Sequence, residues 1–377
     1  MTVRKLVFLT GTRADFGKIK SLLRVLQGNE NFDINIFVTG MHMLQKYGYT
    51  CEEVENEGFK KTYKYINQNH SDTMDAVLAK TVSGFSDYIK ETKPDMIIVH
   101  GDRVEALAGA IVGSLNNILV SHIEGGEVSG TVDELIRHSV SKLSHIHFVA
   151  NEESRTRLIQ LGEKNTSIFI IGSPDLDVMS SEDLPDIDEV KSYYEFDYDD
   201  YGVILFHPVT TELEVLKEHT KQLVKAVCES GLNYIVIYPN NDHGSEELLN
   251  EYNVFKGNNN FRVLPSMRFE YFLTLMKNAK LVLGNSSVGV REAPFYSVPS
   301  VNIGTRQHKR AFLDSVINCA PDKLDITEAI STALNMSPSK SNNFGDGKSA
   351  ELFFEIISGD SIWMESSQKY FIDLEEV

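Results

Sequence analysis

The stretch Lys5-Leu-Val-Phe-Leu-Thr-Gly-Thr-Arg-Ala-Asp15 joins an apolar run to a polar turn and then to a helical pattern. Residues 5–10 contain the uninterrupted apolar run Leu-Val-Phe-Leu, which is typical of a parallel strand buried on both faces. A second stretch, residues 203–212, repeats this order as Val-Ile-Leu-Phe-His-Pro-Val-Thr-Thr-Glu. The two stretches predict two α/β domains, each opening with a strand that leads through a polar turn into a helix.

Short apolar runs alternate with longer helical patterns along the rest of the chain. Helical patterns such as residues 72–92 and 103–116 separate the runs, which is a βαβ rhythm with right-handed crossovers. We expect further strands at residues 34–39, 96–100, 118–122, 145–150, 168–171, 234–238, 261–264, 280–283 and 300–303. The predicted fold class is α/β, with two Rossmann-like domains facing a cleft, and ligands bind beyond the carboxyl ends of such strands.

One segment interrupts the rhythm. Residues 182–200 contain nine acidic residues and a single lysine, a composition that predicts a solvated linker. The expected domains are residues 1–173, carrying the catalytic carboxylates, and residues 174–358. Residues 359–377 are expected to pack back on the first domain.

The composition limits the class of protein. The chain has 377 residues, 36 Lys and Arg, and 54 Asp and Glu, so its formal net charge is −18. This acidity argues against nucleic acid and anionic membranes as partners. No apolar run approaches the ~20 residues of a membrane span, and three distant cysteines form no disulfide framework. We expect a cytoplasmic protein.

The first strand end is suited to an anion. A glycine turn leads into a helix N-terminus at Arg13, Ala14 and Asp15, where backbone N–H groups and the helix dipole favour negative charge. The spacing is not G-x-G-x-x-G, which weakens the interpretation as a dinucleotide-dependent dehydrogenase. An ordinary βα turn with a surface arginine is the alternative for this motif alone.

Two carboxylates follow the next strands. Asp102 and Arg103 come after the strand at 96–100, and Glu124 comes after the strand at 118–122. Adjacent strands lie ~5 Å apart, so the two carboxylates are expected near one another, where each shifts the other's pKa. Helix capping and turn formation are the alternatives for Asp102 and Glu124.

A helical pattern beginning near Thr131 carries a third carboxylate. Asp133 and Arg137 are four residues apart and share one face of this helix, and His138 follows. The alternative to a functional role is that Asp133 and Arg137 form a surface ion pair, which contributes little to stability. Zinc is not expected, because the histidines lack ligand spacing; these are His100, His122, His138, His145 and His147.

Three strand ends of the second half carry similar chemistry. His207 follows the strand at 203–206, and Arg306 lies beyond the strand at 300–303. Gly284-Asn-Ser-Ser-Val-Gly-Val-Arg-Glu292 runs from a strand through a glycine turn into a predicted helix. Ser286 and Ser287 are the first residues of this predicted helix, where they would bind a pyrophosphate. Glu292 would accept hydrogen bonds from hydroxyls.

Taken in order, these motifs resemble the UDP-N-acetylglucosamine 2-epimerase family, over about 300 residues. The motifs are GTRADFG, HGDR, HIEGGE, TVDELIRH, HPVT, GNSSVGVRE and NIGTR. They are most similar to the hydrolysing branch, which releases N-acetylmannosamine and UDP for sialic acid synthesis. The non-hydrolysing branch has GTRPE as its first motif and usually a glutamate at the position of Asp133. The resemblance implies a GT-B-like fold, a homodimer, and a C-terminal helix near residues 351–357 that returns to the first domain.

The resemblance also implies roles for individual residues. Asp102, Glu124 and Asp133 match the catalytic carboxylates and His207 matches the cleft histidine of the family, with Arg137 and His138 in support. The residues that match UDP-binding positions are Arg13, Ala14, Asp15, Arg103, Ser286, Ser287, Glu292 and Arg306. No cofactor and no metal are implied.

The expected reaction eliminates UDP to give a 2-acetamidoglucal and then adds water with inversion at C2. Three alternatives remain from the sequence. They are a hydrolysing 2-epimerase for a UDP-2,4-diacetamido-6-deoxyhexose, a GT-B glycosyltransferase, and a catalytically inactive sensor of nucleotide sugars.

Overall fold

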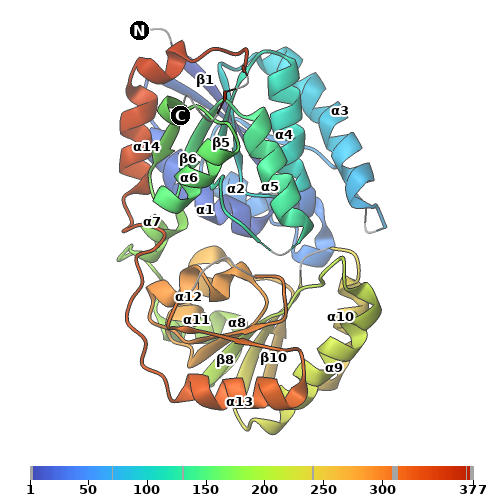
Figure 1. The fold of residues 1–377 in the computed structure, drawn as a ribbon. Helices are drawn as coiled ribbons and strands as arrows, with labels where there is room; N and C mark the ends of the chain where they lie inside the picture. The colour runs from blue at the N-terminus through green and yellow to red at the C-terminus, as the bar shows by residue number, and fades with distance from the viewer. Residues whose placement is uncertain are drawn as a thin grey trace. The chain divides into compact units, whose positions relative to one another are not determined.

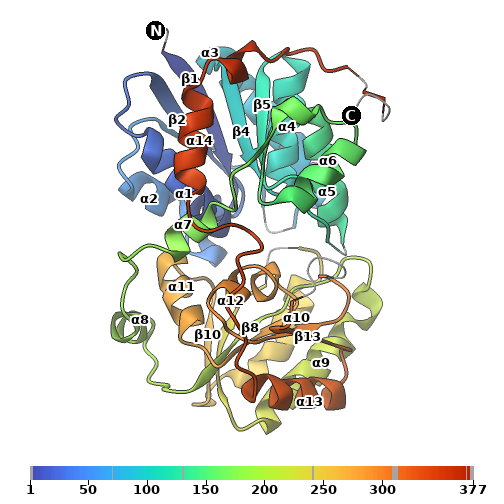
Figure 2. The same ribbon diagram turned by 60° about the vertical axis from the view of Figure 1, so that its left-hand side comes forward.

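The computed structural model describes residues 3–69, 71–129, 131–239, 242–307, 313–370 and 372–373. The chain forms two compact units (Figures 1 and 2). The first domain comprises Met1–Glu127, Asp133–Ser181 and Asn343–Val377, and the second comprises Val128–Val132 and Glu182–Asn342. The boundaries therefore lie near residues 181 and 342, and not at 173 and 358 as predicted.

The first domain is a parallel sheet covered by helices. Within its described residues, the strands have the order β3-β2-β1-β4-β5-β6-β7, and every pairing is parallel. Its elements are β1 Arg4–Thr10, α1 Arg13–Leu26, β2 Phe32–Val38, η1 Gly40–Met43, η2 Gln45–Tyr47, α2 Cys51–Asn56, β3 Thr62–Lys64, α3 Met74–Thr92, β4 Met96–His100, α4 Val104–Leu115, β5 Leu119–Ile123, α5 Val132–Leu143, β6 Ile146–Val149, α6 Glu152–Gln160, η3 Asn165–Ser167, β7 Ile168–Ile170, α7 Asp175–Met179, α14 Ser349–Ser358 and η6 Ser361–Met364.

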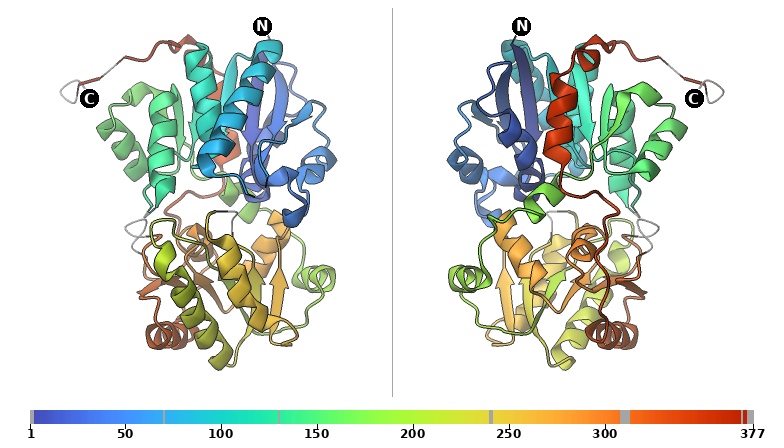
Figure 3. Two further views of the ribbon diagram at one scale, coloured as in Figure 1. Left: turned by 90° about the vertical axis from the view of Figure 1, so that its right-hand side faces the viewer. Right: turned by 90° about the vertical axis from the view of Figure 1, so that its left-hand side faces the viewer.

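The helices of the first domain cover both faces of the sheet. Helices α3 and α4 pack together on one face, and α1 packs against α14 on the other (Figure 3). The strands that these layers enclose are buried almost throughout, as the continuous apolar runs predicted. In β4 and β5, His100 pairs with Ile123, so the chain leaves both strands at the same edge of the sheet.

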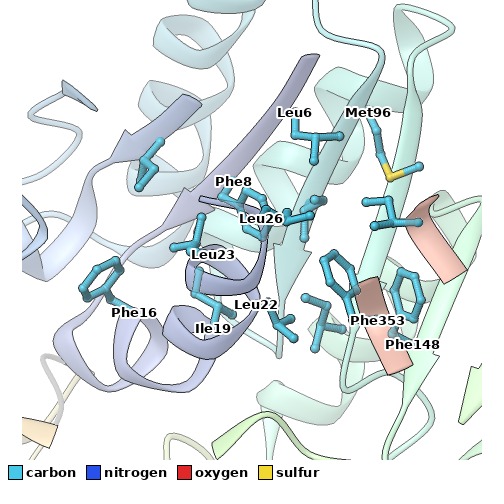
Figure 4. Packing of buried hydrophobic residues seen from close by; sticks show 14 of the residues in the cluster. Leu6, Phe8, Phe16, Ile19, Leu22, Leu23, Leu26, Met96, Phe148 and Phe353 are labelled. Atoms are coloured by element: carbon cyan, nitrogen blue, oxygen red, sulfur yellow. The ribbon is translucent and has the colours of Figure 1, made fainter. Parts of the chain in front are cut away.

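Helix α14 explains why the second predicted boundary is wrong. Its side chains Phe353 and Ile357 are fully buried in the same core as Leu22 and Phe148 (Figure 4). The rings of Phe148 and Phe353 meet edge to face, with centroids 4.9 Å apart. Because this apolar stripe completes the core of the first domain, the chain has returned to that domain before α14 begins.

The second domain repeats the architecture. Among the strands that the structure describes there, the order is β10-β9-β8-β11-β12-β13, again parallel throughout. Its elements are α8 Ile187–Tyr194, β8 Tyr201–Leu205, α9 Leu213–Glu229, β9 Asn233–Ile237, α10 Ser245–Glu251, η4 Tyr252–Phe255, β10 Phe261–Leu264, α11 Phe269–Lys277, β11 Leu281–Gly284, η5 Ser287–Gly289, α12 Glu292–Phe295, β12 Ser300–Ile303, β13 Val316–Cys319 and α13 Lys323–Leu334.

All the strands expected from the sequence are present, with ends displaced by at most two residues. Two edge strands, β3 and β13, were not predicted. Both are short and largely solvent-accessible, so they lack the continuous apolar run that marks the buried strands. Each forms a strand by pairing with one neighbour, β3 with β2 and β13 with β12.

The prediction of a linker at residues 182–200 is wrong for its middle part. Helix α8 begins after Asp186, whose carboxylate accepts a hydrogen bond from the Glu189 backbone N–H at 2.8 Å. Val190 and Tyr194, four residues apart, are buried, while the acidic residues around them face solvent. The acidic composition therefore marks the outer face of an amphipathic helix.

Candidate functional site

The turn after β1 is organised by Asp15, at the N-terminus of α1. Its Oδ2 accepts hydrogen bonds from the Thr10 hydroxyl at 2.8 Å and from the Gly11 backbone N–H at 3.0 Å. Thr12 caps the helix by accepting from the Asp15 backbone N–H at 3.1 Å. Asp15, predicted to hold the nucleotide, thus also closes the turn.

The other two predicted residues of this turn begin α1. Arg13 is its first residue, and the guanidinium forms an ion pair with Glu53 of α2. Ala14 follows and is exposed. The structure therefore places both at the helix N-terminus, where the helix dipole favours an anion.

His100, the last residue of β4, lies between two carboxylates. Its Nδ1 is 2.7 Å from Asp15 Oδ1, and its Nε2 is 3.2 Å from Glu124 Oε2. Burial by itself would lower the pKa of His100, but the charges of Glu124 and Asp15 outweigh it and raise the pKa to about 9. At neutral pH the ring is therefore an imidazolium.

Glu124 has an unusual backbone. It follows β5 with φ at 63°, a left-handed conformation that is rare for residues other than glycine. Its backbone N–H donates to the Phe148 carbonyl at 2.9 Å, and its Oε1 accepts from the Ser173 hydroxyl. With Oε2 facing His100, the carboxylate is held at both oxygens. Strained backbone at a buried carboxylate is a feature of functional sites.

Arg137 connects the two strand ends. Its Nη2 pairs with Asp102 Oδ2, and its Nη1 donates to the backbone carbonyl of Glu124 at 2.6 Å. Glu127 Oε2 lies 4.0 Å from the same Nη1. The Arg137 side chain is only 2% exposed, whereas that of Asp102 is 24% exposed. One buried guanidinium therefore holds Asp102 beside the backbone of Glu124.

The remaining predicted residues of this helix lie around Arg137 on α5. Asp133 is half-buried in the first helical turn, one turn before Arg137. His138 is also half-buried, with its Nε2 at 3.8 Å from Glu134 Oε1. Burial lowers the pKa of His138, so at neutral pH its ring is neutral, unlike that of His100.

Arg103 is positioned by a buried acid that sequence reasoning missed. Arg103 precedes α4 as its N-cap residue, and its Nε donates to Glu105 Oε2 at 3.2 Å. Glu105 is 1% exposed and packs under the β1 turn, where a Cβ at Gly11 would lie 3.0 Å from Glu105 Cδ. A single acid in the otherwise apolar stretch 104–115 was the signal for this contact.

In the second domain, Asn285 joins three strand ends. Its Oδ1 accepts from the His207 backbone N–H at 2.7 Å, and its Nδ2 donates to the His207 carbonyl at 2.8 Å. Its own carbonyl accepts from Arg306 Nη1 at 3.3 Å and from Gln307 Nε2 at 3.0 Å. Sequence reasoning selected His207 and Arg306 but missed the amide that connects them.

The segment after β11 is not the single helix that was predicted. Ser286 caps the short 3₁₀ turn η5, where Ser287 is the first residue, and Glu292 begins the separate four-residue helix α12. Gly289 and two valines lower the helix propensity here, and Pro294 lacks the N–H that a longer helix needs. Glu292 is almost fully buried.

The described residues contain no group of three or more His, Cys, Asp or Glu that could hold a metal ion. No helix in the described part of the chain is both long and apolar enough to cross a membrane. The polar groups described above are carboxylates, arginines and an imidazolium in the first domain, and an arginine, a histidine and hydroxyls in the second.

Comparison with known proteins identifies the family. The family model described as UDP-N-acetylglucosamine 2-epimerase matches residues 24–358. A protein of Neisseria meningitidis serogroup B named UDP-N-acetylglucosamine 2-epimerase is 49% identical over 376 residues, which cover 99% of this chain and 100% of that protein. The chain belongs to the UDP-N-acetylglucosamine 2-epimerase family.

Other members of the epimerase family are also similar to this chain. A Legionella pneumophila protein named UDP-N,N'-diacetylbacillosamine 2-epimerase (hydrolyzing) is 35% identical, over 94% of this chain and 96% of that protein. The Methanocaldococcus jannaschii UDP-GlcNAc 2-epimerase, solved with UDP-GlcNAc and UDP, has a TM-score of 0.78 at 24% identity and covers 94% of this chain and 99% of its own. These findings confirm an enzyme family and a fold of two parallel-sheet α/β domains in the GT-B-like class.

The structure adds partners to the predicted carboxylates of this epimerase family member. Arg137 pairs with Asp102, while His100 and Ser173 contact Glu124. His100 and Ser173 were not among the predicted site residues. The only sequence signal for His100 was its place in the motif HGDR.

Proposed function

We propose that this protein is a hydrolysing UDP-N-acetylglucosamine 2-epimerase, which converts UDP-GlcNAc and water to N-acetylmannosamine and UDP. The observation that carries the proposal is the contact of Arg137 with both Asp102 and the Glu124 backbone, one helical turn from Asp133. This arrangement gathers carboxylates at the edge of the first sheet where ligands of α/β proteins bind. The protein is proposed to act in the cytoplasm, feeding sialic acid or capsule synthesis.

The hydrolysing branch is favoured by two observations. The Legionella pneumophila relative carries the word hydrolyzing in its name and is similar over nearly the whole chain. The motif at residues 11–15 reads Gly-Thr-Arg-Ala-Asp, and position 133 is an aspartate, where the non-hydrolysing branch has GTRPE and usually a glutamate. The homodimer expected from the family resemblance is part of this proposal.

The proposed first step removes the C2 proton of the sugar to a carboxylate while the C1–O bond breaks and UDP leaves with the electron pair. The product is 2-acetamidoglucal. The C2 proton is not adjacent to a carbonyl, so its removal must accompany positive charge at the ring, which a nearby carboxylate stabilises. We assign the proton transfers to Asp102 and Asp133, and stabilisation of the ring or orientation of water to Glu124.

The proposed second step adds water across the double bond. A carboxylic acid delivers a proton to C2 from the opposite face, and water supplies the hydroxyl at C1 while its remaining proton passes to a carboxylate. His100 supports this division of roles, because its imidazolium faces Glu124, which favours an anionic Glu124 that stabilises charge. The family reaction produces no net redox change and requires no cofactor.

The residues proposed to contact the leaving UDP are those that match nucleotide-binding positions of the family. Arg13, Ala14, Asp15 and Arg103 belong to the first domain, and His207, Arg306, Ser286, Ser287 and Glu292 to the second. The role of Arg306 is supported by its hydrogen bond to the Asn285 carbonyl. The Asn285 side chain in turn binds the loop that starts at His207. A positive side chain and hydroxyl donors stabilise the charge that develops on a diphosphate.

The test is to incubate the protein with UDP-GlcNAc in D₂O without any sugar acceptor. The proposal expects UDP release together with N-acetylmannosamine that carries deuterium at C2. Conversion to UDP-N-acetylmannosamine without UDP release would place the protein in the non-hydrolysing branch. Absence of both products would refute the proposed activity on this sugar, and an acceptor-dependent release of UDP would indicate a glycosyltransferase.

A second candidate substrate is a UDP-2,4-diacetamido-6-deoxyhexose. The Legionella pneumophila relative is named for such a sugar, N,N'-diacetylbacillosamine, and is 35% identical to this chain. The Neisseria meningitidis relative, named for UDP-GlcNAc, is 49% identical, which is why UDP-GlcNAc is preferred. Offering both nucleotides separately and comparing kcat/KM for UDP release distinguishes them.

A further inference from the structure

The C-terminal segment of the chain docks on the far end of the helix that carries Arg137. After α14 and η6, residues 365–370 run across the first domain toward α5 and α6 (Figure 2). Lys369 reaches the last turn of α5, where its Nζ lies 2.8 Å from the Lys142 carbonyl and 2.5 Å from the Ser144 carbonyl. The Ser141 carbonyl is farther away, at 3.5 Å.

A helix ends with backbone carbonyls that lack partners within the helix. An ammonium group has three N–H donors, and a positive charge at this end also favours the helix dipole. The three nearest acceptors of Lys369 are the carbonyls of Lys142 and Ser144 and, at 2.5 Å, Glu163 Oε2. Lys369 therefore supplies a cap for α5 from a distant part of the sequence.

The buried carboxylate of Glu163 requires the positive charge of Lys369. This carboxylate is 2% exposed and lies 2.9 Å from His147 Nε2 and 3.1 Å from Lys142 Nζ. Burial opposes ionisation of Glu163, but the contacts with His147 and Lys369 lower its pKa below the usual value. A buried carboxylate that loses one of its cations is costly, so the tail and α5 are coupled through Glu163.

A second contact holds the tail in register. His145 Nδ1 accepts from the Val120 backbone N–H at 3.0 Å, so the ring proton lies on Nε2. That nitrogen is 2.9 Å from the Ser367 carbonyl and donates to it. The neutral ring agrees with its environment, because burial lowers the pKa of His145. His145, which precedes β6, thus holds the tail through Ser367, and His147 of β6 holds it by way of Glu163 and Lys369.

We propose that residues 365–370 position α5 for catalysis, with Lys369 as the positioning residue. At 12 residues, α5 extends about 18 Å and is held at two places by different contacts. Lys369 holds the C-terminal end, and Arg137, the sixth residue of the helix, holds Asp102 and Glu124 near its middle. Loss of the cap lets the helix shift, and with it Arg137 and Asp133. The link to turnover rests on the proposed function.

The experiment compares Lys369→Met, which keeps the length of the side chain, with Lys369→Arg, which keeps the charge. Lys60→Met is the matched control, because Lys60 is an exposed lysine of the same domain. Amide hydrogen exchange of α5, UDP binding, and kcat and KM for UDP release are measured on the full chain. For Lys369→Met we expect exchange in the last turn of α5 to rise about tenfold or more.

We also expect kcat, calculated for the fraction of protein that binds UDP, to fall about tenfold or more in Lys369→Met. Small displacements of reacting groups slow chemistry strongly. KM should change less than about twofold, and Lys369→Arg should recover most of kcat. An unchanged α5 exchange would refute the cap, and faster exchange with unchanged kcat would refute the positioning role.

If Lys369→Met does not fold, Lys369→Gln retains two N–H donors for the carbonyls but loses the charge and the third donor on a side chain that is one atom shorter. It is expected to show the same pattern with smaller changes, and wild-type exchange and kcat in this variant would refute the proposal. If the wild-type protein releases no UDP from any UDP-sugar, the proposed function fails, and α5 exchange alone decides whether Lys369 caps the helix.

Discussion

At the scale of single residues, individual side chains hold the carboxylates of the first-domain site. Asp102 is held by Arg137, while Glu124 lies between His100 and Ser173. Arg137 and Glu124 are almost completely buried, so their interactions are weakly screened by water. The charge state of this site therefore depends on two cations, the guanidinium of Arg137 and the imidazolium of His100.

Substitution of Arg137 by methionine should reduce turnover strongly. The change releases Asp102 and leaves the Glu124 carbonyl without its donor, so we expect kcat for UDP release to fall about 10²–10³-fold. Arg155→Met, at a partly exposed arginine of α6 that contacts Asn165, is the control and should leave kcat near the wild-type value. Turnover of the Arg137→Met enzyme within threefold of wild type would contradict the assigned role.

His100 should make stability depend on pH in the alkaline range. Its folded pKa of about 9 lies above the ~6.5 of an unfolded histidine. Protonated His100 therefore contributes stability that is fully present below about pH 6.5 and is lost as the pH rises through about 9. Urea unfolding should show wild type more stable than His100→Gln at pH 6, with the gap shrinking by pH 9.5. A constant gap would disprove this explanation.

At the scale of elements, loops after strands are tied together by buried amides and glycines. Asn285 connects the loop after β8 to the segment beyond β12. Gly284 just before it has φ at 141°, and a Cβ there would lie 2.0 Å from the Leu205 carbonyl oxygen. No other residue fits this close approach of two strands. The geometry of His207 and Arg306 is therefore set by their neighbours in the loops.

Asn285→Ala should weaken UDP binding. The substitution removes both hydrogen bonds between the Asn285 side chain and the His207 backbone, and we expect the Kd for UDP to rise about 5–20-fold. Asn278→Ala in the same domain removes a side-chain hydrogen bond to the Thr274 carbonyl and serves as the control. Isothermal titration with UDP measures both variants, and equal Kd values for Asn285→Ala and wild type would exclude the proposed arrangement.

At the scale of the whole molecule, the chain builds two separate cores. The core of the first domain includes Leu22, Phe148 and Phe353, and that of the second includes Leu223 and Tyr234. The first domain is assembled from the beginning and the end of the chain, since α14 comes from its last 35 residues. Mutations near the C-terminus are therefore expected to affect the N-terminal domain.

Two core truncations test this division. Phe353→Ala should destabilise the first domain by about 3–5 kcal/mol, and Leu223→Ala should destabilise the second by about 2–5 kcal/mol. Leu352→Ala, beside Phe353 but 38% exposed, should have a small effect. Hydrogen exchange read domain by domain should accelerate in β1 for Phe353→Ala and in β8 for Leu223→Ala. Acceleration of β8 in the Phe353→Ala variant would contradict separate cores.

The sequence alone determined the βαβ rhythm, the buried strands and the strand ends that carry polar residues. These are local properties, because an apolar run and the turn after it are read from neighbouring residues. The positions of Asp102 and Glu124 at adjacent strand ends followed from this rhythm. The sequence also indicated the family, because the motifs of the family are short and lie at those same strand ends.

Only the tertiary structure decided the partners. His100 meets Asp15 across 85 positions, Arg137 meets Asp102 across 35, and Ser367 meets His145 across 222. Such contacts depend on how elements pack and not on any local pattern, so no periodicity predicts them. The same reason explains the unpredicted edge strands β3 and β13, which form by pairing with a neighbouring strand.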